Sequence, residues 1–276
     1  MPNVRCLADA EIEILQDYVR NGGKLLATFA TSLCDASGKE RPDLGMAELL
    51  GCTYVGEKAK TRKDCYQYIL QPDHPLVQPD SAGTELLINA GYTLLCKTRP
   101  GAQVICTHVP TVHNQPPEKA WVAQWSVEHP TVVENRYGAG KVLYFTNQPD
   151  QLSQEIGHPD LRNLLARGIR YLAGAAIPLE SNAPGSVHIG LTQSTENPGQ
   201  YVLSLVNTSS GPGRPVQELI PVRDIEVKLR LPQASLVAWE ALRAQGACTV
   251  QREGQTLLVQ VEKLEDFCAI AIEMGV

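Results

Sequence analysis

The apolar residues at the start of the chain recur with the spacing of a helix. Ile12, Leu15 and Val19 stand three and four residues apart, which places them on one helix face. Asn21-Gly22-Gly23 predicts the end of this helix, because glycine readily adopts the left-handed conformation that follows one. The apolar run over residues 24–29 predicts a short buried strand. Helix, glycine pair and buried strand in succession are typical of an α/β layer.

Alternating helix-like and strand-like segments continue as far as Gly174. Residues 46–50 predict a short helix that Gly51 closes, and Pro159 predicts the start of a longer one with an apolar face through Leu172. Between these two helices, strands are predicted over residues 64–70, 86–96, 103–108, 121–125, 131–136 and 141–146. The sequence therefore predicts an α/β domain over residues 1–174.

The pattern changes to period two after Gly174. Ile225, Val227 and Leu229 alternate with charged residues, and the segments 187–191, 257–261 and 268–272 alternate in the same way. We expect seven short strands here, with turn residues between most of them, which is typical of an antiparallel β-sandwich. The sequence thus predicts an all-β domain over 186–276, joined to the first domain by an Ala- and Pro-rich linker over 175–185.

Charge and composition exclude several classes of protein. The 276 residues carry 24 Lys and Arg against 30 Asp and Glu, a net charge of −6, which argues against a nucleic-acid-binding surface. No stretch reaches the roughly 20 apolar residues that cross a membrane, and no signal peptide is visible. The 8 cysteines form no CxxC pair. Free thiols and the missing export signal favour a cytoplasmic protein.

One arrangement of residues suggests a hydrolase. The helix, the glycine pair and the strand over residues 25–31 resemble the approach to the nucleophile elbow of class I glutamine amidotransferases. Phe29 stands where the nucleophilic cysteine is expected, and Cys34 lies five residues further on. His158-Pro159-Asp160 is similar to that family's His-Pro-Glu triplet, but a proline-initiated helix explains it as well. We expect the fold of that superfamily without its catalytic residues.

Other site chemistry has little support. The histidines show no metal-binding spacing, and no nucleotide-binding glycine motif occurs, so we expect no metal and no cofactor. Trp121 and Trp125 are four residues apart, which on a strand places both on one face. That face fits a sugar platform, a core patch or a subunit interface.

Several motifs in order resemble the β-galactosidase trimerisation domain, the middle domain of glycoside hydrolase family 42. The motifs extend from Pro2 to Gly174 and are Leu7-Ala8-Asp9-Ala10-Glu11, Leu15 to Gly23, Leu25-Leu26-Ala27-Thr28, Thr31-Ser32-Leu33 with Asp35, Ala47 to Gly51, Asn135 to Val142 with Tyr144-Phe145, and Pro159 to Leu165. The sandwich resembles the small C-terminal domain of such enzymes. The resemblance implies a flavodoxin-like, class I glutamine amidotransferase-like three-layer domain followed by a sandwich.

The resemblance also implies what the chain does. In that family a (β/α)8 barrel carries both catalytic glutamates, and this chain is too short to add one to its two domains. We therefore expect a region that is not catalytic by itself, a homo-oligomer that is a trimer by resemblance, and a barrel upstream. Only Met1 to Cys6 precede the first helix, so we expect the chain to begin inside a fold, with a very short edge strand as the alternative.

The loop over residues 31–43 supplies the remaining candidates for binding. Thr31, Ser32, Asp35 and Arg41 offer donors and acceptors at the carboxyl end of a buried strand, where open α/β sheets bind ligands. The loop is either an interface to a domain or a sugar, or a solvated connector. Two other functions stay open, an amidotransferase-like hydrolase with an unrecognised site and a carbohydrate-binding protein.

Overall fold

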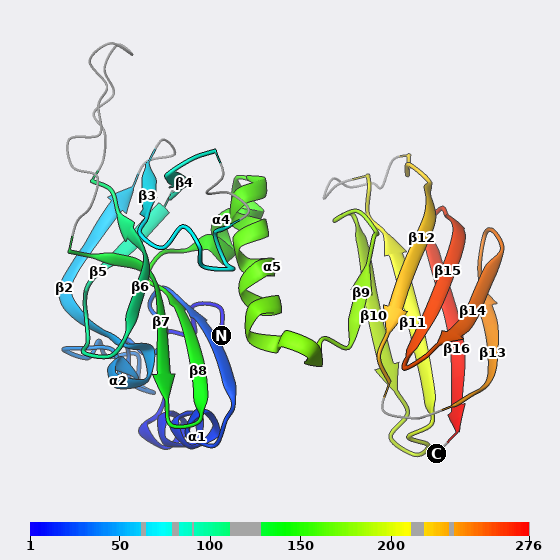
Figure 1. Ribbon diagram of the computed structural model, residues 1–276, viewed down its shortest axis with the longest axis horizontal. Coiled ribbons are helices and arrows are strands. Elements are labelled where there is room, and N and C mark those ends of the chain that lie inside the picture. Colours follow the sequence, from blue (N-terminus) through cyan, green and yellow to red (C-terminus); the bar gives the residue numbers. More distant parts are fainter. Residues whose placement is uncertain are drawn as a thin grey trace, which may run out of the picture. The chain divides into compact units, whose positions relative to one another are not determined.

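The computed structural model describes residues 1–61, 65–78, 83–89, 91–110, 128–210, 218–231 and 235–275. The chain forms two compact units, Met1–Gly174 and Ala175–Val276 (Figure 1). Each unit has a hydrophobic core of its own. In the described part of the chain, no helix is both long and apolar enough to cross a membrane.

The first unit mixes helices and strands. Its described helices are α1 (Asp9–Arg20), α2 (Ala47–Leu50), α4 (Pro149–Glu155) and α5 (Pro159–Ala173). Its described strands are β1 (Lys24–Thr28), β2 (Cys52–Thr61), β3 (Tyr66–Ile69), β4 (Leu86–Ile88), β5 (Gly91–Thr98), β6 (Gln103–His108), β7 (Pro130–Tyr137) and β8 (Gly140–Phe145). The predicted helices at 46–50 and from Pro159 are confirmed, and so is the buried strand that follows α1.

Six of these strands form one mixed sheet in the order β1-β8-β7-β6-β3-β4. Strands β1 and β8 pair in parallel, with Leu26 opposite Leu143. The other pairings of this sheet are antiparallel. The predicted strand over 86–96 is wrong in one respect, because it divides into β4 in this sheet and β5, which pairs with β2 in a separate ribbon.

The six-stranded sheet is covered on both faces. One core cluster joins Ile12 and Val19 of α1 and Leu49 of α2 to the sheet and to the β2–β5 ribbon. A second cluster joins Leu164 and Leu172 of α5 to buried side chains of β6, β7 and β8. The first unit therefore has three layers, with α1, α2 and the ribbon on one face and α5 on the other (Figure 1).

The first six residues run along the free edge of β1. The amide of Thr28 donates to the carbonyl oxygen of Met1 at 3.2 Å, and the amino group of Met1 donates to Leu26 at 2.7 Å. Further along, the amide of Ser32 donates to Val4 and that of Cys34 to Arg5. This segment follows β1 and the loop after it in the parallel direction.

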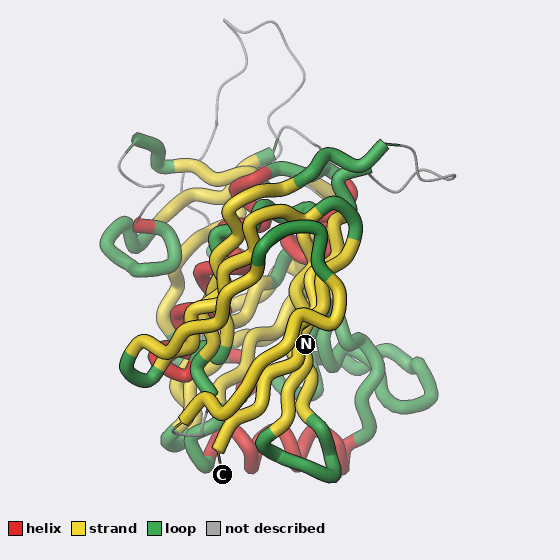
Figure 2. Tube along the Cα trace, turned by 90° about the vertical axis from the view of Figure 1, so that its right-hand side faces the viewer, coloured by secondary structure: helices red, strands yellow, loops and turns green. Residues whose placement is uncertain are grey.

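The second unit is a β-sandwich, and strands, yellow in Figure 2, make up most of it. Its described strands are β9 (Leu179–Ser181), β10 (Val187–Gln193), β11 (Gln200–Asn207), β12 (Val222–Leu229), β13 (Ser235–Arg243), β14 (Cys248–Glu253), β15 (Thr256–Leu264) and β16 (Phe267–Gly275). They form two antiparallel sheets in the orders β10-β11-β16-β13 and β14-β15-β12-β9. The predicted antiparallel sandwich is confirmed.

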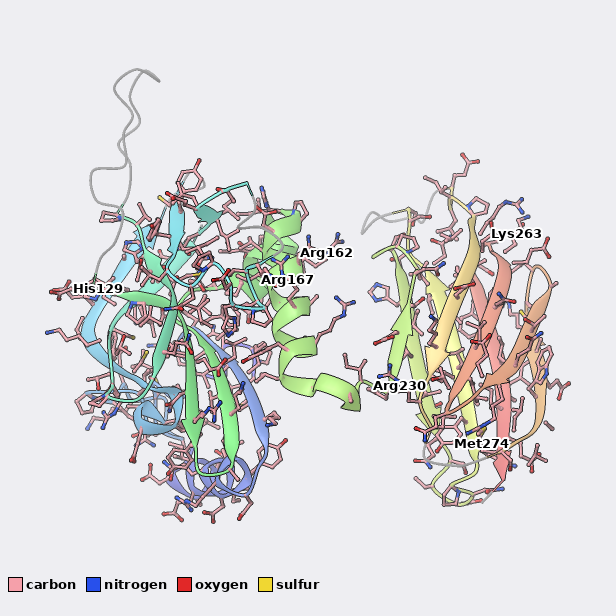
Figure 3. All side chains as sticks on the ribbon, viewed as in Figure 1. His129, Arg162, Arg167, Arg230, Lys263 and Met274 are labelled. Atoms are coloured by element: carbon pink, nitrogen blue, oxygen red, sulfur yellow. The ribbon has the colours of Figure 1, made fainter. Side chains whose placement is uncertain are left out.

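Part of the expected linker belongs to the sandwich. A short 3-10 helix covers Gly174–Ala176, and β9 pairs with β12. Arg230, labelled in Figure 3, donates to the carbonyl oxygens of Ala175 and Ile177, each at 3.4 Å. The half-buried Leu179 packs on the sandwich core. Residues 175–181 are therefore fixed to the second unit rather than forming a free connection.

Strand β13 lies at the edge of its sheet and is exposed almost throughout. Val237, Trp239 and Leu242 expose 61%, 38% and 56% of their surfaces, an unusual amount of apolar side chain for an edge strand. The pairing with β16 shifts register between Leu236 and Ala238 and again between Ala241 and Arg243. These bulges bend the strand along its free edge.

Candidate functional site

The sharp turn after β1 lies where the sequence suggests a nucleophile elbow, and we call it the elbow. Phe29 has φ 46°, a left-handed conformation that is costly for a bulky residue. Its amide donates to the carbonyl oxygen of Phe145 at 2.6 Å, and its own carbonyl oxygen accepts from the hydroxyl of Tyr144 at 2.6 Å. The surrounding structure thus holds the strained position, but its side chain is a benzyl group that cannot attack a carbonyl.

The strand-end segment, residues 146–150, brings a carboxylate to the elbow. The hydroxyl of Thr28 donates to Oδ2 of Asp150 at 2.8 Å. The other oxygen, Oδ1 of Asp150, is buried and has no hydrogen-bond partner in the described part of the chain. Burial lowers the pKa of the Met1 amino group, while the charge of Asp150 acts in the opposite direction. The ends of β1 and β8 therefore meet in a polar site that contains no histidine.

His158-Pro159-Asp160 starts α5 and forms no part of this polar site. His158 is the N-cap residue, and its Nδ1 accepts from the amide of Asp160 at 3.3 Å. Pro159 is the first helical residue, where the missing amide hydrogen costs nothing. The interpretation of the triplet as a proline-initiated helix start is confirmed.

A chain of buried amides extends from the strand-end segment, and the sequence analysis did not find it. Asn147 donates to Asn89 at 2.9 Å, and Asn89 donates to Thr93 at 3.2 Å. Gln148 accepts from the amide of Tyr92 at 3.0 Å. The sequence does contain a pattern that could have predicted it, since three polar residues, Thr146-Asn147-Gln148, directly follow a buried strand. These bonds join the sheet to the β2–β5 ribbon.

Two of the predicted site residues are fully buried. Thr31 and Ser32 are both 0% exposed. The hydroxyl of Thr31 donates to the carbonyl oxygen of Thr28 at 2.7 Å, and that of Ser32 accepts from the amide of Met46 at 3.0 Å. Their hydroxyls hold the shape of the loop and do not reach its surface.

Asp35 and Arg41 lie on the outer part of the same loop. Oδ1 of Asp35 accepts from the hydroxyl of Ser37 at 2.6 Å and from the amides of Ser37 and Lys39. The hydrogen bond from the Ser37 hydroxyl is the main cause that lowers the pKa of Asp35. Arg41 donates to the carbonyl oxygen of Leu7 at 3.1 Å and to Asp9 at 2.6 Å. Both side chains order the loop, while Trp121 and Trp125 lie outside the described residues.

The first unit also contains a buried ionic cluster on its α5 face. Glu134 of β7 accepts from Tyr171 of α5 at 2.7 Å and lies 3.1 Å from both His74 and Lys141. The amide of Leu76 donates to Nδ1 of His74, which leaves Nε2 to donate to Glu134. Burial alone raises the pKa of Glu134, but its three partners outweigh burial and lower the pKa to about 2. The cluster is satisfied internally and joins α5 to the sheet.

In the described part of the chain, these arrangements do not bring together the cysteine and histidine of an amidotransferase-type hydrolase. At the elbow, the structure places no nucleophile and no histidine base among the described residues. No group of three His, Cys, Asp or Glu side chains in that part of the chain could hold a metal ion. Among the described residues, the elbow and the strand-end segment form a polar site without a cysteine nucleophile and a histidine base.

No protein-family model matches the chain, and no curated protein matches its sequence. Solved structures do share its fold. The α-L-fucosidase isoenzyme 2 from Paenibacillus thiaminolyticus matches 100% of this chain with a TM-score of 0.72 and 18% identity. The β-galactosidase from Bacillus circulans sp. alkalophilus matches 98% with a TM-score of 0.58 and 13% identity. Gan42B, a GH42 β-galactosidase from G. stearothermophilus, matches 99% with a TM-score of 0.56 and 13% identity.

The chain spans only part of these glycosidases. It covers 40% of the fucosidase and 32% and 31% of the two β-galactosidases. At such identities the likeness concerns the fold alone. Both units of this chain thus share their folds with one region of much longer glycoside hydrolases.

Proposed function

We propose that this chain is a non-catalytic oligomerisation and structural region of a glycoside-hydrolase-like protein of the β-galactosidase type. The observation that carries the proposal is Phe29, an inert side chain in the strained position of a nucleophile elbow. The first unit corresponds in this proposal to a trimerisation domain with an amidotransferase-like, flavodoxin-related fold. The second unit corresponds to a C-terminal sandwich.

The partial match to glycosidases supports the same proposal. Nearly all of this chain is similar to less than half of each of these enzymes. The remainder of such a protein, a (β/α)8 barrel by the resemblance of the sequence, supplies the chemistry in our proposal. The role of this chain is to assemble copies and to support a carbohydrate site formed elsewhere.

A turnover assay tests the missing chemistry. We expect the purified chain to hydrolyse neither aryl β-galactosides and α-L-fucosides nor glutamine. The control is the same preparation mixed with a commercial glycosidase, which excludes inhibition by the buffer. Turnover that disappears in Cys34→Ser or Asp35→Asn would overturn the proposal, because it would place an active site on the loop after the elbow.

Light scattering with analytical ultracentrifugation tests the assembly role. Closed rings are the expected form for a symmetric homo-oligomer, and a trimer is the form that the resemblance implies. We expect a mass three times that of the chain at micromolar concentration. A strict monomer over the whole concentration range would contradict assembly by this chain and would leave the turnover result unaffected.

Carbohydrate binding by the sandwich is a second candidate, which one hollow favours. A hollow of about 470 Å³ lies over the sheet β10-β11-β16-β13 and is lined by Thr192, Gln200, Trp239, Glu240 and Glu273, among others. This volume is within the roughly 300–1,000 Å³ of small-molecule sites. Calorimetry with lactose and L-fucose tests it, with Glu240→Gln as the variant and Glu226→Gln on the other sheet as the control. Equal heats of sugar binding in Glu240→Gln and Glu226→Gln would exclude this hollow as the binding site.

A further inference from the structure

Two cysteines from separate segments are neighbours in the backbone of the first unit. Cys6 and Cys34 form a parallel β-bridge beside the loop that follows the elbow. The amide of Cys34 donates to the carbonyl oxygen of Arg5 at 2.8 Å, and the amide of Leu7 donates to that of Cys34 at 3.1 Å. Because these bonds flank Cys6 on both sides, they fix the register of the pair.

The two cysteine side chains leave the bridge on the same face. Leu7, next to Cys6, and Leu33, next to Cys34, are 7% and 0% exposed and point into one core cluster. Residues that pair directly across a β-bridge carry their side chains on the same face, so the Cβ atoms of Cys6 and Cys34 lie next to each other. Paired strands lie about 4.8 Å apart, within the Cα separation of roughly 4.4–6.8 Å that a disulfide requires.

The environments of the two thiols differ in a useful way. Cys6 is exposed, whereas Cys34 is only 1% exposed. Nε of Arg5 donates to the sulfur of Cys34 at 3.1 Å, and Nη2 of the same guanidinium donates to Glu40 at 2.8 Å. The guanidinium of Arg5 therefore holds the sulfur of Cys34 in a fixed position. Cys6 therefore supplies access, and Cys34 supplies a resolving sulfur that Arg5 positions.

We propose that Cys6 and Cys34 are an oxidisable dithiol that a low-molecular-weight disulfide converts to an internal disulfide. The sulfur of Cys6 attacks one sulfur of the small disulfide, forms a mixed disulfide and releases one small thiol, which keeps the proton of Cys6. The thiolate of Cys34 then attacks the sulfur of Cys6, the mixed disulfide breaks, and the second small thiol leaves with the proton of Cys34. The protein loses two protons and two electrons, and one small disulfide becomes two thiols.

Peptide mapping by mass spectrometry tests the pairing on the wild-type chain. The protein is incubated with oxidised glutathione, alkylated under denaturing conditions and digested without reduction. We expect a cross-linked peptide pair that contains Cys6 and Cys34, with the other 6 of the 8 cysteines still alkylated. No cross-link, or one between other cysteines, overturns the proposal.

A second thiol pair in the same chain is the internal control. Cys248 and Cys268 share a side-chain hydrogen bond between the two sheets of the sandwich, and burial raises the pKa of both thiols, that of Cys268 to about 12. This pair lies close together, and among the described residues no guanidinium donates to either of its sulfurs. We expect it to stay reduced while Cys6 and Cys34 react. Equal oxidation of both pairs would show that proximity alone determines which thiols form a disulfide, and it would overturn the role of Arg5.

Variants separate the two steps. Cys34→Ser must stop at the mixed disulfide on Cys6, and Cys6→Ser must leave Cys34 unmodified. Arg5→Ala should slow closure about tenfold while the mixed disulfide forms at the wild-type rate, and Arg5→Lys should restore part of the difference. Circular dichroism confirms that each variant is folded. A closure rate in Arg5→Ala equal to that of the wild type overturns the positioning role of the guanidinium.

Discussion

The hydroxyl of Tyr144 donates a hydrogen bond of 2.6 Å to the carbonyl oxygen of Phe29, from β8 to the turn that follows β1. The side chain of Tyr144 is 0% exposed, and burial raises its pKa well above the ordinary value. The bond thus holds the left-handed residue of the elbow against the neighbouring parallel strand.

Tyr144→Phe should destabilise the first unit by about 1–2 kcal/mol, because it removes the hydrogen bond to the carbonyl oxygen of Phe29. Urea unfolding followed by circular dichroism measures this change. Tyr18→Phe on the exposed surface of α1 is the matched control and should change the free energy of unfolding much less. Equal losses in the two variants would show that the bond to Phe29 contributes nothing to stability.

Phe29→Cys should give no glutaminase or esterase activity, although it places a thiol at the elbow. The strand-end segment provides Asn147, Gln148 and Asp150 where a histidine base would be needed to activate the thiol. Burst kinetics with a p-nitrophenyl ester measure both acylation and turnover. Rapid turnover in this variant would mean that a base at the elbow has escaped identification.

Glu134→Gln should lower stability by about 3 kcal/mol at neutral pH, because it leaves Lys141 and Tyr171 without a charged partner. The loss depends on pH with a definite sign. The pKa of Glu134 is lowered from 4.5 to about 2, so its contribution is present above pH 4.5 and disappears as the pH falls towards 2. The thermal unfolding midpoints of the wild type and of Glu134→Gln should therefore converge as the pH falls over this range. A constant difference between them would contradict the role of the ionised carboxylate.

Gly51→Ala should destabilise the chain more than Gly56→Ala, although both glycines have positive φ. The φ values are 73° and 85°, so the backbone strain of an alanine is similar at the two positions. An added Cβ at Gly51 would lie 2.8 Å from Cβ of Ala102 and 3.0 Å from that of Asn135, whereas nothing lies within 4 Å at Gly56. Denaturant unfolding should show a loss of about 1 kcal/mol in the free energy of unfolding for Gly56→Ala, which comes from backbone strain. The loss for Gly51→Ala should be clearly larger. Equal values would mean that the neighbours of Gly51 move aside freely.

Local periodicity predicted most of the regular structure. The helical spacing before Asn21 and the alternation from Ile225 to Leu229 each reflect one buried face, so α1 and β12 could be read from the sequence. Strand β9 could not, because a segment of three residues shows no periodicity and its pairing with β12 is distant in the chain. The separation of β4 from β5 was missed for a similar reason.

The polar site was harder to predict than the fold. The position of Phe29 at the end of a glycine-preceded strand was enough to identify the elbow. In contrast, the burial of Thr31 and Ser32 depends on contacts with residues 1–4 and with Met46, which no local pattern reveals. The bond between Asn147 and Asn89 joins residues 58 positions apart in the same way.

The bulges in β13 have a consequence for how this protein behaves at high concentration. A straight nine-residue edge with exposed valine, tryptophan and leucine would offer each molecule a template for the next, and edge-to-edge pairing of that kind is not limited to two copies. The interruptions at Val237 and Leu242 limit how many successive hydrogen bonds an incoming strand can form. Removing both residues would restore the regular spacing of the edge and favour growth into fibres over closed assemblies.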